Sequence, residues 1–314
     1  MTRAVRLALA VATCLALLAC AVPHQQGDTA VTKLAIEEGD VDAVYARYRE
    51  VYEAAVDIGS AQPLSVVESG SVLAIDTAAF QVEGGVTSTV LRAEQVAIPR
   101  FGSYPLWFVA VAGSGSDERR VQVFARGSAV DPWTLSESPA IVAEASLPEL
   151  RVTDDASAVA VAPDDDRGMP FSPQAAVDAY VAALGSLPES PSDVVAADDP
   201  FRQQMVESYQ QSAELPDVQF SQSWTAEPVQ YVLRTADGGA LVFATLHRAD
   251  AFQVTQGRTV AYAAGTVQNA LAPEGIVGSG VVRFDHQVLL VVPPGSGEVR
   301  AIGQFGGVVA VESS

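Results

Sequence analysis

Residues 281–311, which read VVRFDHQVLLVVPPGSGEVRAIGQFGGVVAV, decide the fold class of this chain. Two runs rich in valine, leucine and isoleucine, 281–292 and 298–311, flank the sequence PPGSG at 293–297. β-Branched residues favour strands, whereas proline and glycine favour turns, so the stretch predicts an antiparallel hairpin. Upstream, ADGG at 236–239 predicts another hairpin. Antiparallel strands are therefore expected to dominate the C-terminal half.

Each group of predicted strands follows a predicted helix. Apolar residues at three- and four-residue spacing predict an amphipathic helix over 40–58, ended by Gly59. Ser-Pro at 172–173 is typical of a helix start, so a helix is predicted over 172–184, and another over 200–211. The remaining strands are predicted over 86–98, 106–112, 119–125, 140–145, 158–161, 229–235 and 240–247.

The stretch 162–169, APDDDRGM, interrupts this pattern with proline, glycine and consecutive aspartates. Both halves therefore have the order helix then strands, which predicts an α+β fold of two similar units, each with N-terminal helices packed on a curved antiparallel sheet. The predicted organisation is a signal peptide at 1–19, a lipidated cysteine and tether at 20–39, α+β units at 40–162 and 172–314, and a linker at 163–171.

A helix followed by a curved antiparallel sheet resembles the nuclear transport factor 2-like and cystatin-like folds. The whole chain also resembles uncharacterised two-domain lipoproteins of actinobacteria. Lys33 is the only lysine among the 18 basic residues, which is typical of a high-GC genome. Neither resemblance brings a catalytic residue, because function does not follow from fold.

The first twenty residues have the pattern of an export signal. Arg3 and Arg6 precede an uncharged, apolar run over 7–19 that is too short to span a bilayer comfortably. The run ends in Leu17, Leu18, Ala19 and Cys20, which resembles the lipobox of bacterial lipoproteins. The resemblance implies that diacylglycerol is attached to the Cys20 sulfur and that the chain is cleaved before Cys20.

Such processing would hold the protein at the extracytoplasmic face of the cell membrane without a transmembrane helix, because two acyl chains anchor stably. Two alternatives remain open. Cys14 could be the modified residue, although Thr13 suits cleavage poorly and the apolar run before it is short. Alternatively, Cys20 could be an ordinary signal-sequence residue, with cleavage after Ala21.

The mature chain would be strongly acidic. Removal of residues 1–19 lowers the number of basic residues from 18 to 16 against 38 acidic residues, a net charge of about −22. This charge disfavours binding to nucleic acid and to anionic lipid surfaces. With the sulfur of Cys20 occupied, no cysteine remains for a disulfide or a metal site, so the core must stabilise the fold.

Histidines and serines raise the possibility of a hydrolase triad. His24 lies in the predicted tether, whereas His247 and His286 lie in predicted strands. Asp285 cannot readily orient His286, because adjacent residues of a strand point to opposite faces. The chain contains no G-x-S-x-G sequence. Surface histidines without a catalytic role are therefore expected.

Clustered aspartates raise the possibility of a calcium site. Asp164, Asp165 and Asp166 follow Asp154 and Asp155, but the spacing after Asp164 does not fit an EF-hand loop. A solvated linker is the favoured interpretation. The chain also lacks H-E-x-x-H, Walker A and G-x-G-x-x-G sequences, so neither a metal nor a cofactor is expected.

Several aromatic residues group in the sequence and could stack on a ligand such as a sugar. Their predicted helix and strands are strongly apolar, so packing in the core is the favoured interpretation. The groups are Tyr45, Tyr48 and Tyr52; Tyr104, Trp107 and Phe108; and Phe220 and Trp224.

These observations favour a non-enzymatic, membrane-anchored envelope lipoprotein that binds a protein partner or presents a pocket to a small ligand. A transport-associated ligand-binding protein is an alternative, which would have one deep cleft between the two units. A cell-envelope hydrolase is another, which would require His247 or His286 to face a pocket beside an acid.

Overall fold

The computed structural model describes residues 32–313, except 88–90, 116–117, 144 and 190–192. Lys33–Ser314 form one compact unit, in place of the expected two units joined by a linker at 163–171. The unit begins inside the predicted tether, since Ala35 and Ile36 are buried. There, β1 (Lys33–Leu34) pairs with β3 (Arg100–Phe101) in a small separate sheet.

The predicted helices are present with nearly the expected bounds: α2 (Val41–Ile58), α4 (Pro173–Gly185) and α5 (Pro200–Ala213). Gly59 ends α2 in the left-handed region at a φ of 62°. The Ser172 side chain accepts a hydrogen bond from the Ala175 amide, which caps α4. Sequence analysis missed α3 (Gly70–Ala79) and α6 (Val267–Leu271), and it missed the short 3-10 helices η1 (Glu38–Asp40) and η2 (Gln62–Val66).

A ten-stranded antiparallel sheet runs through both halves in the order β2-β4-β5-β7-β12-β11-β10-β8, with β6 beside β5 and β9 beside β10. The predicted hairpins are its β9-β10 and β11-β12 pairs. The strands of the first half are β2 (Arg92–Ala97), β4 (Leu106–Gly113), β5 (Arg119–Arg126), β6 (Thr134–Glu137) and β7 (Ala140–Ile141). Those of the second half are β8 (Val218–Ala226), β9 (Tyr231–Arg234), β10 (Ala240–Val254), β11 (Ser279–Val292) and β12 (Arg300–Ser313).

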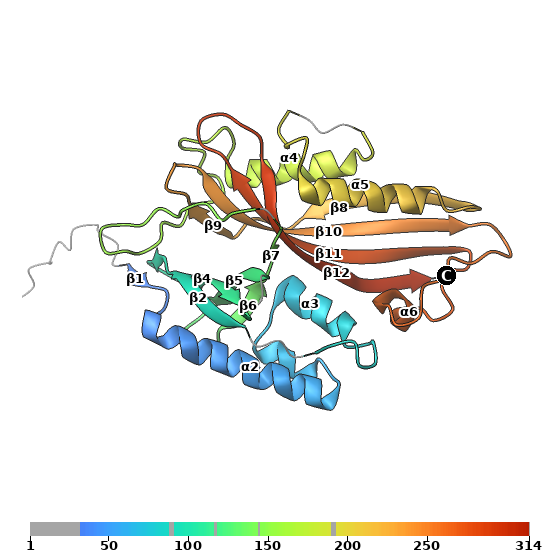
Figure 1. Ribbon diagram of the computed structural model, residues 1–314, viewed down its shortest axis with the longest axis horizontal. Coiled ribbons are helices and arrows are strands. Elements are labelled where there is room, and N and C mark those ends of the chain that lie inside the picture. Colours follow the sequence, from blue (N-terminus) through green and yellow to red (C-terminus); the bar gives the residue numbers. More distant parts are fainter. Residues whose placement is uncertain (1–31, 88–90, 116–117, 144, 190–192, 314) are drawn as a thin grey trace, which may run out of the picture. The chain divides into compact units, whose positions relative to one another are not determined.

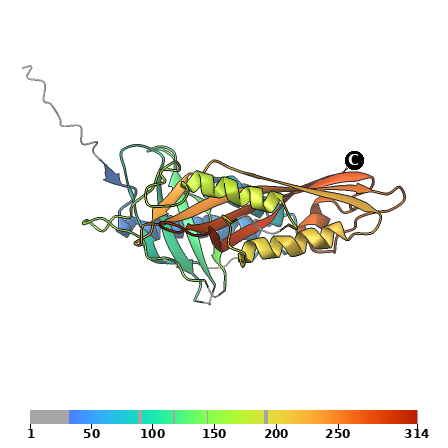
Figure 2. The ribbon, with the colours of Figure 1, turned by 90° about the horizontal axis from the view of Figure 1, so that it is seen from above.

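The sheet turns back on itself at β7, so its two parts pack face to face. Trp107 and Val123 of the first half share an apolar core with Phe243, Leu289 and Ile302 of the second. Alternate residues of the same strands point outward and meet the helices, as strand geometry requires. Figures 1 and 2 show α2 outside the first part and α4 and α5 outside the second.

This shared core explains why the chain does not divide at 163–171. Each sheet part buries one face against its helices and the other face against the opposite part, so neither half completes a core alone. The predicted linker also joins the core through Met169, which is 8% exposed. The α+β class is confirmed, and both halves keep the order helix then strands.

Candidate functional site

One face of the paired strands β10 and β11 lines the space between the two sheet parts, and its side chains change from apolar to polar along the strands. Leu241 and Phe243 of β10 contribute to the shared apolar core. Thr245 and His247 continue the same face, because alternate residues of a strand share a side. Opposite these four residues on β11 lie Val291, Leu289, Gln287 and Asp285. The space between the sheet parts is thus apolar at one end and polar at the other.

The apolar end contains a cavity of about 370 Å³, called here the apolar pocket. Its volume lies within the range of about 300–1,000 Å³ that is usual for small-molecule sites. Aliphatic side chains of β2, β4 and β5 form the inner wall, and residues 147–158 cover it. The lining consists of Gln95, Val96, Ala97, Val109, Val111, Val121, Leu147, Pro148, Glu149, Leu150, Val152, Ala156, Ala158 and Leu241.

Residues 147–158, the covering segment, are held by single bridges instead of a continuous ladder. Leu150 bridges to Thr235 of the second half, and Ala158 bridges to Pro99 of the first. Between them Val152 is 57% exposed at the mouth of the pocket. The segment therefore joins both halves of the molecule while it closes one side of the apolar pocket.

A tight turn within the covering segment is built around Asp155. Its carboxylate accepts a hydrogen bond from the Ser157 hydroxyl (2.7 Å), and Thr153 also donates to it. These side-chain hydrogen bonds lower the pKa of Asp155 to about 2. Asp155 therefore stabilises the turn, and it also forms an ion pair with Arg100 at 2.9 Å.

The polar end contains a smaller cavity of about 220 Å³, called here the polar pocket. The side chain of Glu137 lies at its wall and is only 6% exposed. Thr245 donates a hydrogen bond to Glu137 Oε1 (2.8 Å), but Oε2 has no partner in the described part of the protein. The lining consists of Ser69, Gly70, Ser71, Ser136, Glu137, Glu227, Pro228, Gln230, Tyr231, Phe243 and Thr245.

Burial raises the pKa of Glu137 to about 8, and the nearby Glu227 carboxylate adds to the effect. A carboxylate is stabilised by water, which the interior of the protein excludes, so the neutral form is favoured. Glu137 therefore holds its proton at neutral pH. In that form it offers a hydroxyl donor as well as acceptor oxygens.

A chain of buried hydrogen bonds connects the two halves next to the polar pocket. Gln287 of β11 accepts from the Ser138 amide (2.7 Å) and donates to Ser71 Oγ (2.6 Å) and the Ser136 carbonyl (2.9 Å). Gln122 donates to Ser138 Oγ and accepts from Tyr45 of α2. Since Gln287 is completely buried, these contacts fix α3 and β6 against the paired strands β10 and β11.

Both histidines of the predicted strands were expected at the surface, but His286 is buried. His286 is buried at 8% exposure, and its ring packs on Trp224 and Phe201. Burial lowers its pKa to about 3, and its Nε2 has no partner in the described part of the structure. It faces the core beneath α5, because its neighbour Asp285 takes the opposite face of β11.

His247 of β10 pairs with Asp285 of the neighbouring strand β11, a contact that sequence analysis missed. The two residues are direct partners in the β10-β11 register, and His247 Nδ1 lies 2.7 Å from Asp285 Oδ1. This hydrogen bond raises the pKa of His247. Only the register of β10 against β11, two strands separated by residues 255–278, could have indicated the pair.

The other ring nitrogen of His247 does not face a nucleophile. His247 Nε2 lies 3.3 Å from Glu227 Oε1, so a carboxylate occupies the place of a triad hydroxyl. The two carboxylates favour the protonated form of the imidazole between them. Within the described residues, His247 therefore forms an ion-paired cluster with Asp285 and Glu227 at the edge of the polar pocket.

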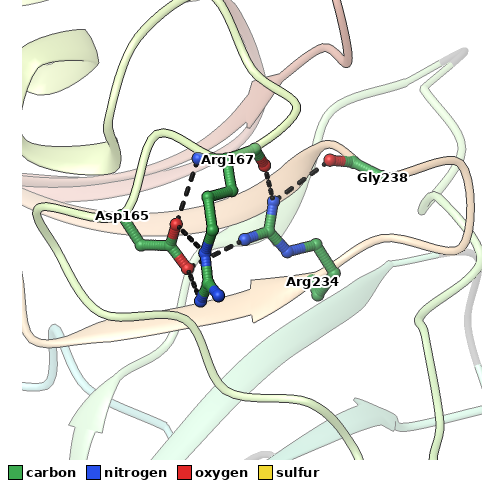
Figure 3. A network of polar contacts seen from close by, with 4 residues as sticks. All are labelled: Asp165, Arg167, Arg234 and Gly238. Atoms are coloured by element: carbon green, nitrogen blue, oxygen red, sulfur yellow. Dashed lines mark hydrogen bonds and ion pairs between the residues drawn. The ribbon is translucent and has the colours of Figure 1, made fainter.

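Asp165 of the predicted linker is used in ion pairs, as Figure 3 shows. Asp165 accepts from the Arg167 amide and guanidinium and from Arg234 Nη2 (3.2 Å). These contacts hold the pKa of Asp165 below its usual range. Arg234 also donates to the Arg167 and Gly238 carbonyls, so 163–171 is attached to the β9-β10 turn and is not a free linker.

A calcium site is not assembled from the clustered acids. Across the described ranges, no group of three or more histidine, cysteine, aspartate or glutamate side chains could hold a metal ion. The residues Leu17, Leu18, Ala19, Cys20 and His24 lie outside the described residues.

The aromatic groups pack mainly in the core. Tyr45 and Tyr48 of α2 contact Phe124 of β5, and Tyr52 contacts Phe80. The other groups are divided among several clusters: Trp107 contacts Phe101 and Tyr231; Phe108 contacts Phe124 and Trp133; Phe220 contacts Tyr209 and Phe252; and Tyr104 lies beside Lys33 and Arg126.

Fold and site together define an α+β protein whose ten-stranded antiparallel sheet folds back over an apolar and a polar pocket. The chain belongs to the family described as Domain of unknown function (DUF8094), whose model matches residues 34–313. This range corresponds closely to the compact unit, Lys33–Ser314.

The chain is also similar to a protein of Streptomyces avermitilis (strain ATCC 31267) named "Uncharacterized lipoprotein", with 29% identity over 221 residues. The match covers 68% of this chain and 64% of the length of that relative. No solved structure is significantly similar to the chain. Among the helices of the described part, none is both long and apolar enough to cross a membrane.

Proposed function

We propose that this protein is an extracytoplasmic lipoprotein, anchored to the cell membrane through Cys20, that binds a small apolar ligand in the apolar pocket. The sequence Leu17 to Cys20 and the name of the Streptomyces relative support the anchor. The observation that carries the binding role is the apolar pocket itself, about 370 Å³ between the two sheet parts. The role is one of binding, without a catalysed reaction.

The lining of the apolar pocket favours an uncharged, largely aliphatic ligand. Val109, Val111 and Val121 contribute its inner wall, and each is at most 9% exposed. Burial of one methylene group contributes about 0.8 kcal/mol, so six methylenes would contribute about 5 kcal/mol before the cost of binding. Gln95 and Glu149, both exposed, lie where a polar head group could remain in water.

Position at the membrane suits this role, because apolar ligands partition into lipid. The protein would take such a molecule from the membrane surface or present it to an envelope protein partner. Net acidity argues against nucleic acid as a partner. A hydrolytic role is less well supported, since His247 faces carboxylates on both ring nitrogens.

Binding of an uncharged fluorescent probe, N-phenyl-1-naphthylamine, tests the proposal. We expect its emission to rise on binding, 1-decanol to displace it, and 1-decanol to raise the Tm of the protein. Val152→Asp places a charge at the pocket mouth and should weaken probe binding about tenfold or more. Val130→Asp is the matched control, because Val130 is 92% exposed and lies outside the pocket lining.

Equal probe binding by the Val152→Asp and Val130→Asp variants would refute the assignment of the pocket. The anchor is tested separately by cell fractionation. The substitution Cys20→Ala should move the protein from the membrane fraction to the soluble fraction. Membrane retention of that variant would refute lipidation at Cys20.

A further inference from the structure

We propose that the polar pocket is a separate binding site and that it takes the ammonium group of a small primary amine. The juxtaposition that carries this inference is two carboxyl groups and two aromatic rings around one cavity of about 220 Å³. The site is distinct from the apolar pocket, and its occupation does not depend on the binding role proposed above.

The carboxyl groups come from different parts of the chain. Glu137 ends β6, whereas Glu227 follows β8 directly. One oxygen of Glu137 is satisfied by Thr245, and the other has no partner in the described part of the protein. An unpartnered polar atom in the interior is unfavourable, so a ligand that donates a hydrogen bond to Glu137 Oε2 would relieve a defect of the free protein.

The charges around the cavity favour a cation. Neither lysine nor arginine contributes to the lining as described, so an anion would face two carboxyl groups, and the nearby His247 is already paired with Glu227. Tyr231 and Phe243 supply aromatic faces, which attract ammonium groups. The N-terminus of α3, at Ser69 to Ser71, opposes a cation, but its effect is confined to the first turn and is weaker than that of a buried ion pair.

Hydrogen-bonding capacity also matches an ammonium group. It carries three donors and no acceptor, whereas the lining offers the oxygens of Glu137, Glu227, Ser136 and Thr245. An alcohol of the same shape has one donor and gains no ion pair. The pocket should therefore distinguish an amine from its isosteric alcohol.

The inference predicts that binding of an amine releases a proton from Glu137. In the free protein at neutral pH, Glu137 is protonated because it is buried. Binding of R–NH3+ would convert it to the carboxylate, with its proton released to solvent. The charged and titratable groups facing Glu137 are Glu227 and Tyr231, with His247 beyond Glu227, and Glu137 is the group that gives up its proton in this exchange.

Calorimetric titration of the full mature protein with benzylamine, benzyl alcohol and benzoate tests the inference. At pH 6.5, in two buffers of different ionisation enthalpy, benzylamine should bind at least tenfold more tightly than the other two. It should release close to one proton per molecule bound. Glu137→Gln should lower benzylamine affinity at least tenfold and abolish proton release, whereas Glu207→Gln, on the exposed side of α5, should change neither.

The Val152→Asp variant should retain amine binding, which separates this site from the apolar pocket. If Glu137→Gln does not fold, two other measurements test the inference. They are the benzylamine affinity of Glu227→Gln, which should be lowered, and the number of protons that the unchanged protein releases per benzylamine bound. Equal affinity for amine and alcohol, no detectable amine binding at 10 mM, or binding without proton release would each overturn the assignment.

Discussion

At the scale of single residues, His286 gives the clearest link between structure and stability. Its ring is packed among aromatic side chains, and burial lowers its pKa to about 3. In the unfolded chain a histidine has a pKa of about 6.5. Below pH 6.5 the unfolded state therefore binds a proton that the folded state does not.

His286 should thus make the protein less stable as pH falls from 6.5 toward 3, with no loss above 6.5. The expected slope is about 1.4 kcal/mol of unfolding free energy per pH unit for this one group. Urea denaturation between pH 4 and 7 measures it, and His286→Phe should show a slope lower by that amount. An unchanged slope in His286→Phe would show that other groups cause the acid sensitivity.

At the scale of elements, the segment 163–171 is attached to the β9-β10 turn by Arg234. The guanidinium bonds two carbonyls and Asp165, and Arg234 is 8% exposed. Replacement by methionine would leave the Arg167 and Gly238 carbonyls without this donor. We expect Arg234→Met to lower the free energy of unfolding by about 2 kcal/mol.

Release of this segment should also expose it to protease. Trypsin can cleave after Arg167, whose side chain is 85% exposed, once the backbone around it is mobile. Limited trypsinolysis with mass spectrometry should show faster cleavage there in Arg234→Met than in the unchanged protein. Arg283→Met, which breaks an exposed pair with Glu312, is the control and should not alter cleavage at Arg167.

Several local elements were well predicted from the sequence, because their signals are local, whereas β6 and β8 were missed and the predicted strand 158–161 forms only isolated bridges. The hairpins 229–247 and 281–311 and the helix 40–58 follow from turn residues and apolar spacing within each stretch. The missed helix α3 has a left-handed glycine, Gly70, as its first residue and no capping side-chain hydrogen bond, so its start carries no recognisable signal.

Contacts between distant parts were not predictable in the same way. Pairing of His247 with Asp285 requires the register between β10 and β11, which no tight turn sets. Burial of Glu137 beside Thr245 requires knowledge that the sheet turns back at β7. The sequence predicted two units because each half repeats the order helix then strands. Whether each half can complete its core alone is a property of packing that this order does not contain.

At the scale of the whole molecule, one shared core predicts one unfolding transition. Tryptophan fluorescence reports mainly on the first half through Trp107 and Trp133, while Trp224 reports on the second. Trp107→Phe combined with Trp133→Phe leaves only the second-half signal. In urea, its midpoint should coincide with the midpoint from far-ultraviolet circular dichroism. Two separated midpoints would instead support two independently folding domains.

The polar row formed by Thr245 and Gln287 also bears on which strand pairings the chain can adopt. A slip of β11 by two residues would keep its apolar and polar faces but would place Gln287 opposite Phe243. The glutamine would then lose the Ser138 amide and the Ser136 carbonyl and enter an apolar environment. Buried polarity at this position therefore selects the native register, because a misaligned pairing of β10 with β11 becomes costly as the two halves close.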